Sequence, residues 1–143
     1  MLAGKTVTIK GTDETTEASP ANVSTVTAPK LNVTAGDGVT ITGSGAIPLI
    51  ADDNGGECAV TLNAGGDVEI VNKGGMAVFG PLTVTEAHNV TIGGGGTSLL
   101  YSANGVHCIN ASGTVKMESS GIVCSGNDAN GLTITGAETV DIA

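Results

Sequence analysis

The sequence contains no arginine and no tryptophan, and its aromatic side chains are limited to Phe79 and Tyr101. Domains of this length, 143 residues, usually draw much of their core volume from aromatic rings. In this chain apolar residues make up 40% of the composition, so Val, Ile, Leu, Ala and Thr have to fill the interior. We therefore expect a narrow core.

Positive charge is also scarce, because five lysines stand against fourteen carboxylates and the formal net charge is −9. Nucleic acids and anionic membrane surfaces both attract basic faces, so the composition argues against both as partners. No apolar run approaches the ~20 residues of a membrane-spanning helix, and residues 1–10 lack the apolar core of a secretion signal. We expect no insertion into a membrane.

Three cysteines, Cys58, Cys108 and Cys124, lack CxxC spacing, which predicts buried free thiols rather than disulfides or a zinc site. The abundant residues are glycine, with 23 copies, together with valine and threonine, and they favour strands and tight turns. No apolar stripe of helical period persists for three turns. The composition therefore predicts an all-β chain.

One phrase recurs along the chain, as in "LTVTEAHNVTIG" at 82–93 and "LTITGAETVDIA" at 132–143. Its reference valines are Val7, Val39, Val68, Val90, Val115 and Val140. Two residues later come Ile9, Ile41, Ile70, Ile92, Met117 and Ile142. Six residues before the last five valines come Val33, Leu62, Val84, Ile109 and Ile134, and eight before come Leu31, Val60, Leu82, His107 and Leu132. Only His107 breaks the apolar pattern.

The alternation within each phrase predicts two short strands joined by a turn, and a third strand-like segment lies between phrases. Repeats of this size cannot bury their own apolar face, so they stack, each strand pairing in parallel with its equivalent one coil away. We predict one all-β domain over residues 1–143, a parallel β-solenoid of about five coils of three short strands without substantial α-helix. The polar segment 11–21 is expected to be an excursion loop.

This skeleton resembles the right-handed parallel β-helix of pectin-lyase-like architecture. It is similar to the Gly/Thr/Val-rich "VTI" coils of bacterial secreted and cell-surface proteins. The likeness covers about residues 4–143 and is one of repeat pattern. It implies a fold and an extracellular or cell-surface location, and it implies no particular activity.

Enzymes of this architecture use clustered aspartates with a nearby His and a basic pair, or Ca²⁺ with an Arg or Lys base. The missing arginine removes the commonest lyase base and the usual clamp on uronic acids. Asp52-Asp53 is the only pair of adjacent aspartates, and neither His88 nor His107 is next to it. We therefore expect a non-catalytic module, with a degenerate or incomplete polysaccharide lyase or glycoside hydrolase as the alternative.

Two groups of residues are candidate binding sites. Asp52, Asp53 and Glu57 offer several oxygen ligands within six residues, so they are the candidate Ca²⁺ site, the alternative being a solvated turn. Ile50, Phe79 and Tyr101 each lie nine residues after an apolar partner in the repeat, so we expect them to stack in consecutive coils. Facing outward they form a strip on which sugar rings can lie, and facing inward they form a core stack. The strand alternation leaves both open.

The expected function is therefore adhesion or carbohydrate binding, with a polysaccharide or cell-surface glycan as partner, or a purely structural stalk or spacer.

Some polar residues of the repeat are expected to be structural. The residues that share one offset in the repeat, and that we predict to form a ladder of polar side chains, are Thr34, Asn63, Thr85, Asn110 and Thr135. His107 is either a neutral core histidine with one hydrogen bond, or the sign of a register slip that buries Val106.

The last phrase supplies two strands of a further coil, with neither the third strand nor a polar cap. Solenoids need capping at their ends, since bare coils expose strand edges and apolar side chains. We expect this open C-terminal end to be covered by further coils of a longer chain or by self-association.

Overall fold

The computed structural model describes residues 2–10, 25–52, 56–103, 105–126 and 131–143. Over these ranges the backbone forms strands β1 to β15 and no helix. The strands are β1 (Leu2–Lys10), β2 (Val26–Thr27), β3 (Lys30–Gly43), β4 (Ile50–Ala51), β5 (Ala59–Ala64), β6 (Val68–Asn72), β7 (Val78–Phe79), β8 (Leu82–Glu86), β9 (Val90–Gly94), β10 (Ser98–Ser102), β11 (His107–Asn110), β12 (Thr114–Ser119), β13 (Ile122–Gly126), β14 (Leu132–Thr135) and β15 (Thr139–Ile142). The predicted excursion loop lies outside the described residues.

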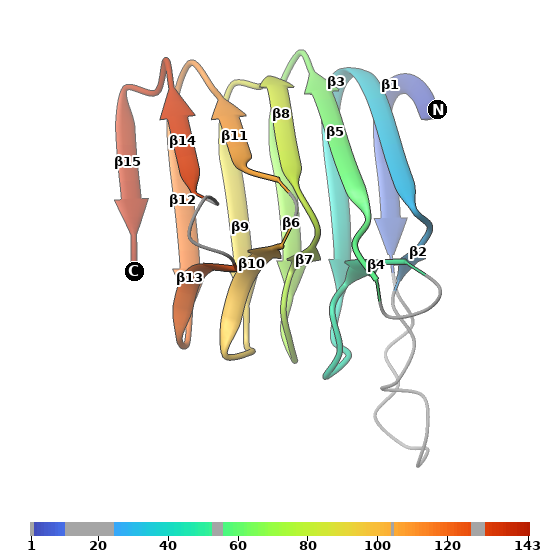
Figure 1. Cartoon of the computed structure of the whole chain (residues 1–143). Helices are drawn as coiled ribbons and strands as arrows, with labels where there is room; N and C mark the ends of the chain where they lie inside the picture. The colour runs from blue at the N-terminus through green and yellow to red at the C-terminus, as the bar shows by residue number, and fades with distance from the viewer. Residues whose placement is uncertain (1, 11–24, 53–55, 104, 127–130) are drawn as a thin grey trace.

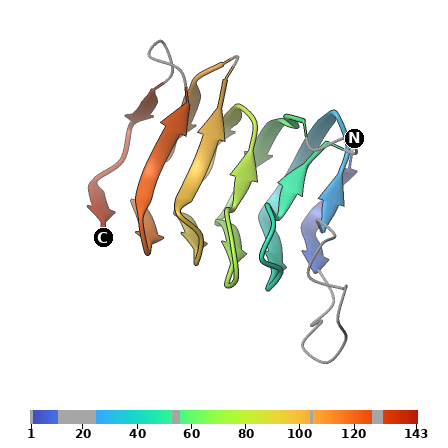
Figure 2. The same cartoon turned by 60° about the horizontal axis from the view of Figure 1, so that its bottom comes forward.

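The strands form three faces that run along the molecule. One sheet has the order β14-β11-β8-β5-β3-β6-β9-β12-β15, with β1 beside β3, so two faces meet at the long strand β3. The third face is the sheet β13-β10-β7-β4-β2. Figure 1 shows the turns side by side with the two termini at opposite ends, and Figure 2 shows the same stack from another side.

The fold is therefore a parallel β-solenoid of about four turns, which confirms the predicted fold class. The predicted number of about five coils is slightly too high. Four successive turns each have three separate strands, beginning with β4, β7, β10 and β13. In the turn before them, β3 runs as one strand where two were predicted. β1 pairs with both halves of β3, from Val33 to Thr42, with a register shift between Gly4 and Thr6.

The register confirms the predicted columns. All six reference valines, from Val7 to Val140, are paired in one row, and so are the residues from Ile9 to Ile142. The row from Val33 to Ile134 is paired in the same way. Apolar residues at a constant offset in the repeat therefore stack on one another from coil to coil. They do so because parallel strands of neighbouring coils lie about 4.8 Å apart and place equivalent side chains next to each other.

Aliphatic side chains make up most of the described core between the faces. Its fully buried members include Val39, Ile41, Leu62, Val68, Ile70, Leu82, Val90, Ile92, Ile109, Val115 and Met117. Burying a Val, Leu, Ile or Met side chain stabilises the fold by about 1.5–3 kcal/mol. Since each column runs through every turn, the core is continuous from one coil to the next.

The predicted outward ladder is regular in part. Thr34 pairs with Asn63, and Asn110 pairs with Thr135. Between them the register shifts, so that Asn63 pairs with Glu86 and Thr85 becomes an extra residue. The ladder prediction is therefore wrong at Thr85, because a β-bulge in β8 displaces this residue from the column.

Candidate functional site

Phe79 in β7 and Tyr101 in β10 form an aromatic pair on the third face. The two residues are in register, and their ring centroids lie 4.7 Å apart with an interplanar angle of 15°. Their predecessors, Val78 and Leu100, are fully buried, whereas both rings are half-buried. Since successive strand residues point to opposite sides, the pair faces outward, which decides between the two predicted orientations.

Ile50 does not belong to this stack. It pairs with Val78 and is completely buried, so it cannot contact a ligand on the outer surface. The prediction assumed that residues nine positions after the repeat isoleucines share one column. Ile50 lies nine residues after Ile41, but its actual partner Val78 lies only eight after Ile70. The turn before β4 is one residue longer than the turn before β7. The prediction that Ile50 joins the carbohydrate-binding strip is therefore corrected.

The surroundings of the pair determine what it can offer. Its two rings pack face against face, and both side chains remain partly exposed to solvent. On the side of Tyr101 away from Phe79, the register places Ser125 of β13. A serine is too small to cover an aromatic ring. The outer face of Tyr101 therefore meets no large side chain from the neighbouring strand.

The acidic corner is only partly within the described residues. Asp53 lies outside them, while Asp52 and Glu57 are half-buried. The Asp52 N–H donates to the Gly56 carbonyl (3.0 Å). In the described part of the chain, no group of three His, Cys, Asp or Glu side chains is placed to hold a metal ion. Calcium binding at Asp52, Asp53 and Glu57 stays a prediction.

Glu57 has a role that the sequence pattern did not indicate. Its Oε2 accepts a hydrogen bond from Ser102 Oγ (3.2 Å), and its Oε1 accepts one from the Ala103 N–H. Ser102 Oγ in turn accepts from the Gly105 N–H (3.0 Å). The two bonds of Glu57 connect segments more than forty residues apart, so spacing along the chain could not have revealed them. Glu57 organises the loop after β10.

His107 is fully buried and pairs with Leu132, while Val106 is 46% exposed. The register slip is therefore excluded, and the predicted core histidine with one hydrogen bond is confirmed: the Leu82 N–H donates to His107 Nδ1 (3.2 Å). Burial lowers the pKa of His107, and the nearby Glu57 carboxylate opposes this only in part. The imidazole is consequently held neutral in the core.

All three cysteines are free thiols, as predicted, but only Cys58 is fully buried. Burial, together with the negative charge of Asp52, raises the pKa of the Cys58 thiol to about 11. Burial also raises the pKa of Cys124. Cys58 is therefore a protonated, unreactive core residue at neutral pH.

Across the described ranges, no helix is long and apolar enough to cross a membrane. Comparison of the chain with protein-family models, with curated proteins and with solved structures finds no match. Function therefore has to be inferred from the chain's own fold and side chains.

Proposed function

We propose that this chain is a non-catalytic, right-handed β-helix module of the pectin-lyase-like type. In this proposal it belongs to a larger bacterial secreted or surface protein and binds a polysaccharide or cell-surface glycan. The observation that carries the proposal is the outward-facing, half-buried pair of Phe79 and Tyr101, which are the two aromatic residues of the whole chain. Neither ring is used to fill the core.

The pair supplies the two kinds of contact that a sugar needs. The apolar C–H face of a sugar ring can pack on the face of Tyr101 that looks toward Ser125. The Tyr101 hydroxyl can donate to, or accept from, a sugar hydroxyl. Because the rings are stacked on each other, each holds the other in place and little side-chain entropy is lost on binding.

An enzymatic function has less support. Of the residues weighed for catalysis, His107 is completely buried and Asp53 lies outside the described residues. The Glu57 carboxylate, at the same corner, is engaged with Ser102 and Ala103. A structural stalk or spacer is the stronger alternative, because the face-to-face packing of the rings also stabilises neighbouring coils.

Binding to a panel of soluble and insoluble polysaccharides tests the proposal. We expect Tyr101→Ala and Phe79→Ala to weaken binding tenfold or more, which corresponds to about 1.4 kcal/mol. Thr61→Ala, at an exposed position of β5 on another face, is the control and should bind like the wild type. Circular dichroism would show that the variants remain folded. Wild-type binding by both aromatic variants, or no binding by the wild type, would favour the spacer.

A further inference from the structure

A polar hollow of about 360 Å³ lies at the corner where β8 turns into β9, next to the equivalent corner between β11 and β12. Its lining includes Gly65, Thr85, Glu86, His88, Asn110 and Ser112, and we call it the corner hollow. It lies at the opposite end of β8 from the aromatic pair. Its volume is in the range of small-ligand sites.

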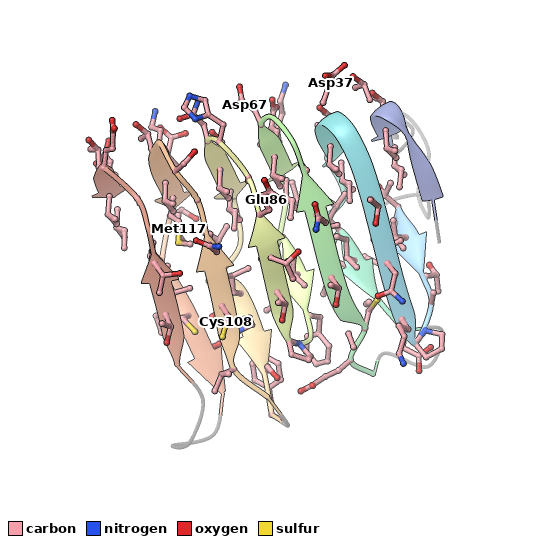
Figure 3. All side chains as sticks on the ribbon, turned by 90° about the horizontal axis from the view of Figure 1, so that it is seen from above. Asp37, Asp67, Glu86, Cys108 and Met117 are labelled. Atoms are coloured by element: carbon pink, nitrogen blue, oxygen red, sulfur yellow. The ribbon has the colours of Figure 1, made fainter. Side chains whose placement is uncertain are left out.

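The bulge in β8 shapes one wall. With Thr85 displaced, its hydroxyl donates back to the Leu62 carbonyl (3.3 Å), and Asn110 Nδ2 donates to the Thr85 carbonyl (3.1 Å). Glu86 takes the outward place beside Asn63. Figure 3 shows Glu86 on β8, and Asp67 and Asp37 at the turns of preceding coils. Bulges commonly re-aim a side chain next to a functional site.

His88 forms the second wall. Its Nδ1 lies 3.1 Å from Ser112 Oγ, so the two side chains share a hydrogen bond across the coils. The equivalent positions one coil before and one coil after are Gly66 and Gly113, connected to His88 by backbone hydrogen bonds of 2.7 Å each. A Cβ on Gly113 would lie 3.0 Å from the His88 ring. Glycines on both sides therefore leave room for the imidazole and for a ligand.

Two polar groups of the hollow have no partner among the described residues, whereas Asn110 and Ser112 also bond to Thr85, Thr135 and His88. The Glu86 carboxylate and His88 Nε2 make no hydrogen bond or ion pair with the rest of the described chain. Glu86, His88, Asn110 and Ser112 are all exposed to solvent. Together they offer a carboxylate acceptor, an imidazole nitrogen, an amide and a hydroxyl around one space.

The charge and polarity of the lining residues determine which class of ligand the hollow can bind. No lysine is among the lining residues, and the negative charge of Glu86 repels uronates and phosphates. The lining has too few apolar side chains for a hydrophobic ligand. Adjacent hydroxyls of a neutral sugar both donate and accept, and hydrogen bonds from them to a carboxylate are charge-assisted.

We propose that the corner hollow binds one residue of a neutral saccharide through the side chains of Glu86, His88, Asn110 and Ser112. This inference rests on the proposed carbohydrate binding and narrows its ligand class to uncharged sugars. It does not depend on the aromatic pair, which lies on a different face of the same two coils.

The test is a titration of the ¹⁵N-labelled chain with methyl glucoside, methyl galactoside and methyl mannoside, with galacturonate as the acidic comparison. We expect saturable amide shifts at Glu86, His88, Ser112 and Gly113 with at least one neutral sugar and none with galacturonate. Glu86→Gln should weaken the neutral sugar about tenfold. The matched control is Glu69→Gln, the same change at an exposed carboxylate of β6 outside the hollow.

The outcomes separate this inference from the proposed function. Shifts at the hollow that persist in Phe79→Ala support an independent sugar site. Equal or stronger shifts with galacturonate, or equal losses in Glu86→Gln and Glu69→Gln, overturn the inference. If polysaccharides bind through Phe79 and Tyr101 while no monosaccharide perturbs the hollow, the inference is wrong and the proposed function stands.

Discussion

At the residue scale, His107 shows why one polar side chain interrupts an otherwise apolar column. The pairing of β8 with β11 begins at Thr83 and Cys108, so the Leu82 N–H lies just before this ladder. His107 Nδ1 accepts the hydrogen bond from that N–H, which places the imidazole proton on Nε2. Nε2 has no partner among the described residues, and an unpaired buried group costs about 1–3 kcal/mol.

This environment makes a prediction for the pH dependence of stability. The pKa of His107 is lower in the folded chain than its ordinary value of 6.5, chiefly because of burial. The unfolded chain therefore takes up the proton first, so stability is complete above about pH 6.5 and falls as the pH drops toward the folded pKa. Over that window we expect the free energy of unfolding to fall by up to about 1.4 kcal/mol per pH unit.

Urea unfolding at pH 8, 6 and 5 would measure this loss. His107→Gln keeps an acceptor for the Leu82 N–H and removes the titrating group, so its slope between pH 6.5 and 5 should be smaller. His88→Gln, at an exposed imidazole, is the comparison that isolates the buried group. Identical slopes in the wild type and His107→Gln would contradict the prediction.

At the element scale, the turns between strands set which residues meet. One additional residue before β4 moved Ile50 from the aromatic column into the core, and one additional residue in β8 brought Glu86 to the corner hollow. Neither change disturbs the apolar columns on either side. Apolar spacing therefore predicted the strands, but it could not predict the bulge, because Thr85 keeps the regular offset along the chain.

The connection from β7 to β8 leads to a prediction about Gly80. This residue has φ = 144°, a backbone conformation that favours glycine. A Cβ at this position would collide with the backbone of Cys58. We expect Gly80→Ala to lower the free energy of unfolding by about 3 kcal/mol or more, from backbone strain and the clash.

Gly131→Ala is the matched control for Gly80→Ala, since an added Cβ there has nothing within 4 Å. It should change stability by less than about 0.5 kcal/mol. Chemical denaturation of both variants gives the comparison. Equal effects of the two changes would show that the β7–β8 corner can relax around a side chain.

At the scale of the whole molecule, stability is distributed along columns of stacked apolar residues. Ile92 is fully buried between Ile70 and Met117, whereas Ile142, in the same column, is 48% exposed in β15. We expect Ile92→Ala to cost about 3–4 kcal/mol, in the range for buried isoleucines, and Ile142→Ala to cost about 1 kcal/mol or less. Thermal and urea unfolding would measure both, and similar losses would argue against a core that weakens toward this end.

The C-terminal turn differs from the others in its exposure. Ile122, Val140 and Ile142 are between 48% and 60% exposed, and β13, β14 and β15 are the outermost strands of their faces. Exposed apolar side chains beside unpaired strand edges favour association with another β-structure. That another β-structure covers these strands stays a prediction.

The amino-acid sequence by itself determined the class of fold and the core columns, because the alternation within strands and the constant offset between them are local and repeated. Only the tertiary structure decided where the aromatic rings point and which polar side chains contact each other. Phe79 and Tyr101 face outward, Glu57 reaches Ser102, and His88 reaches Ser112. These contacts join segments 22 to 45 residues apart, counted from the residue numbers. They depend on turn lengths and on one β-bulge, and the pattern of apolar residues predicts neither.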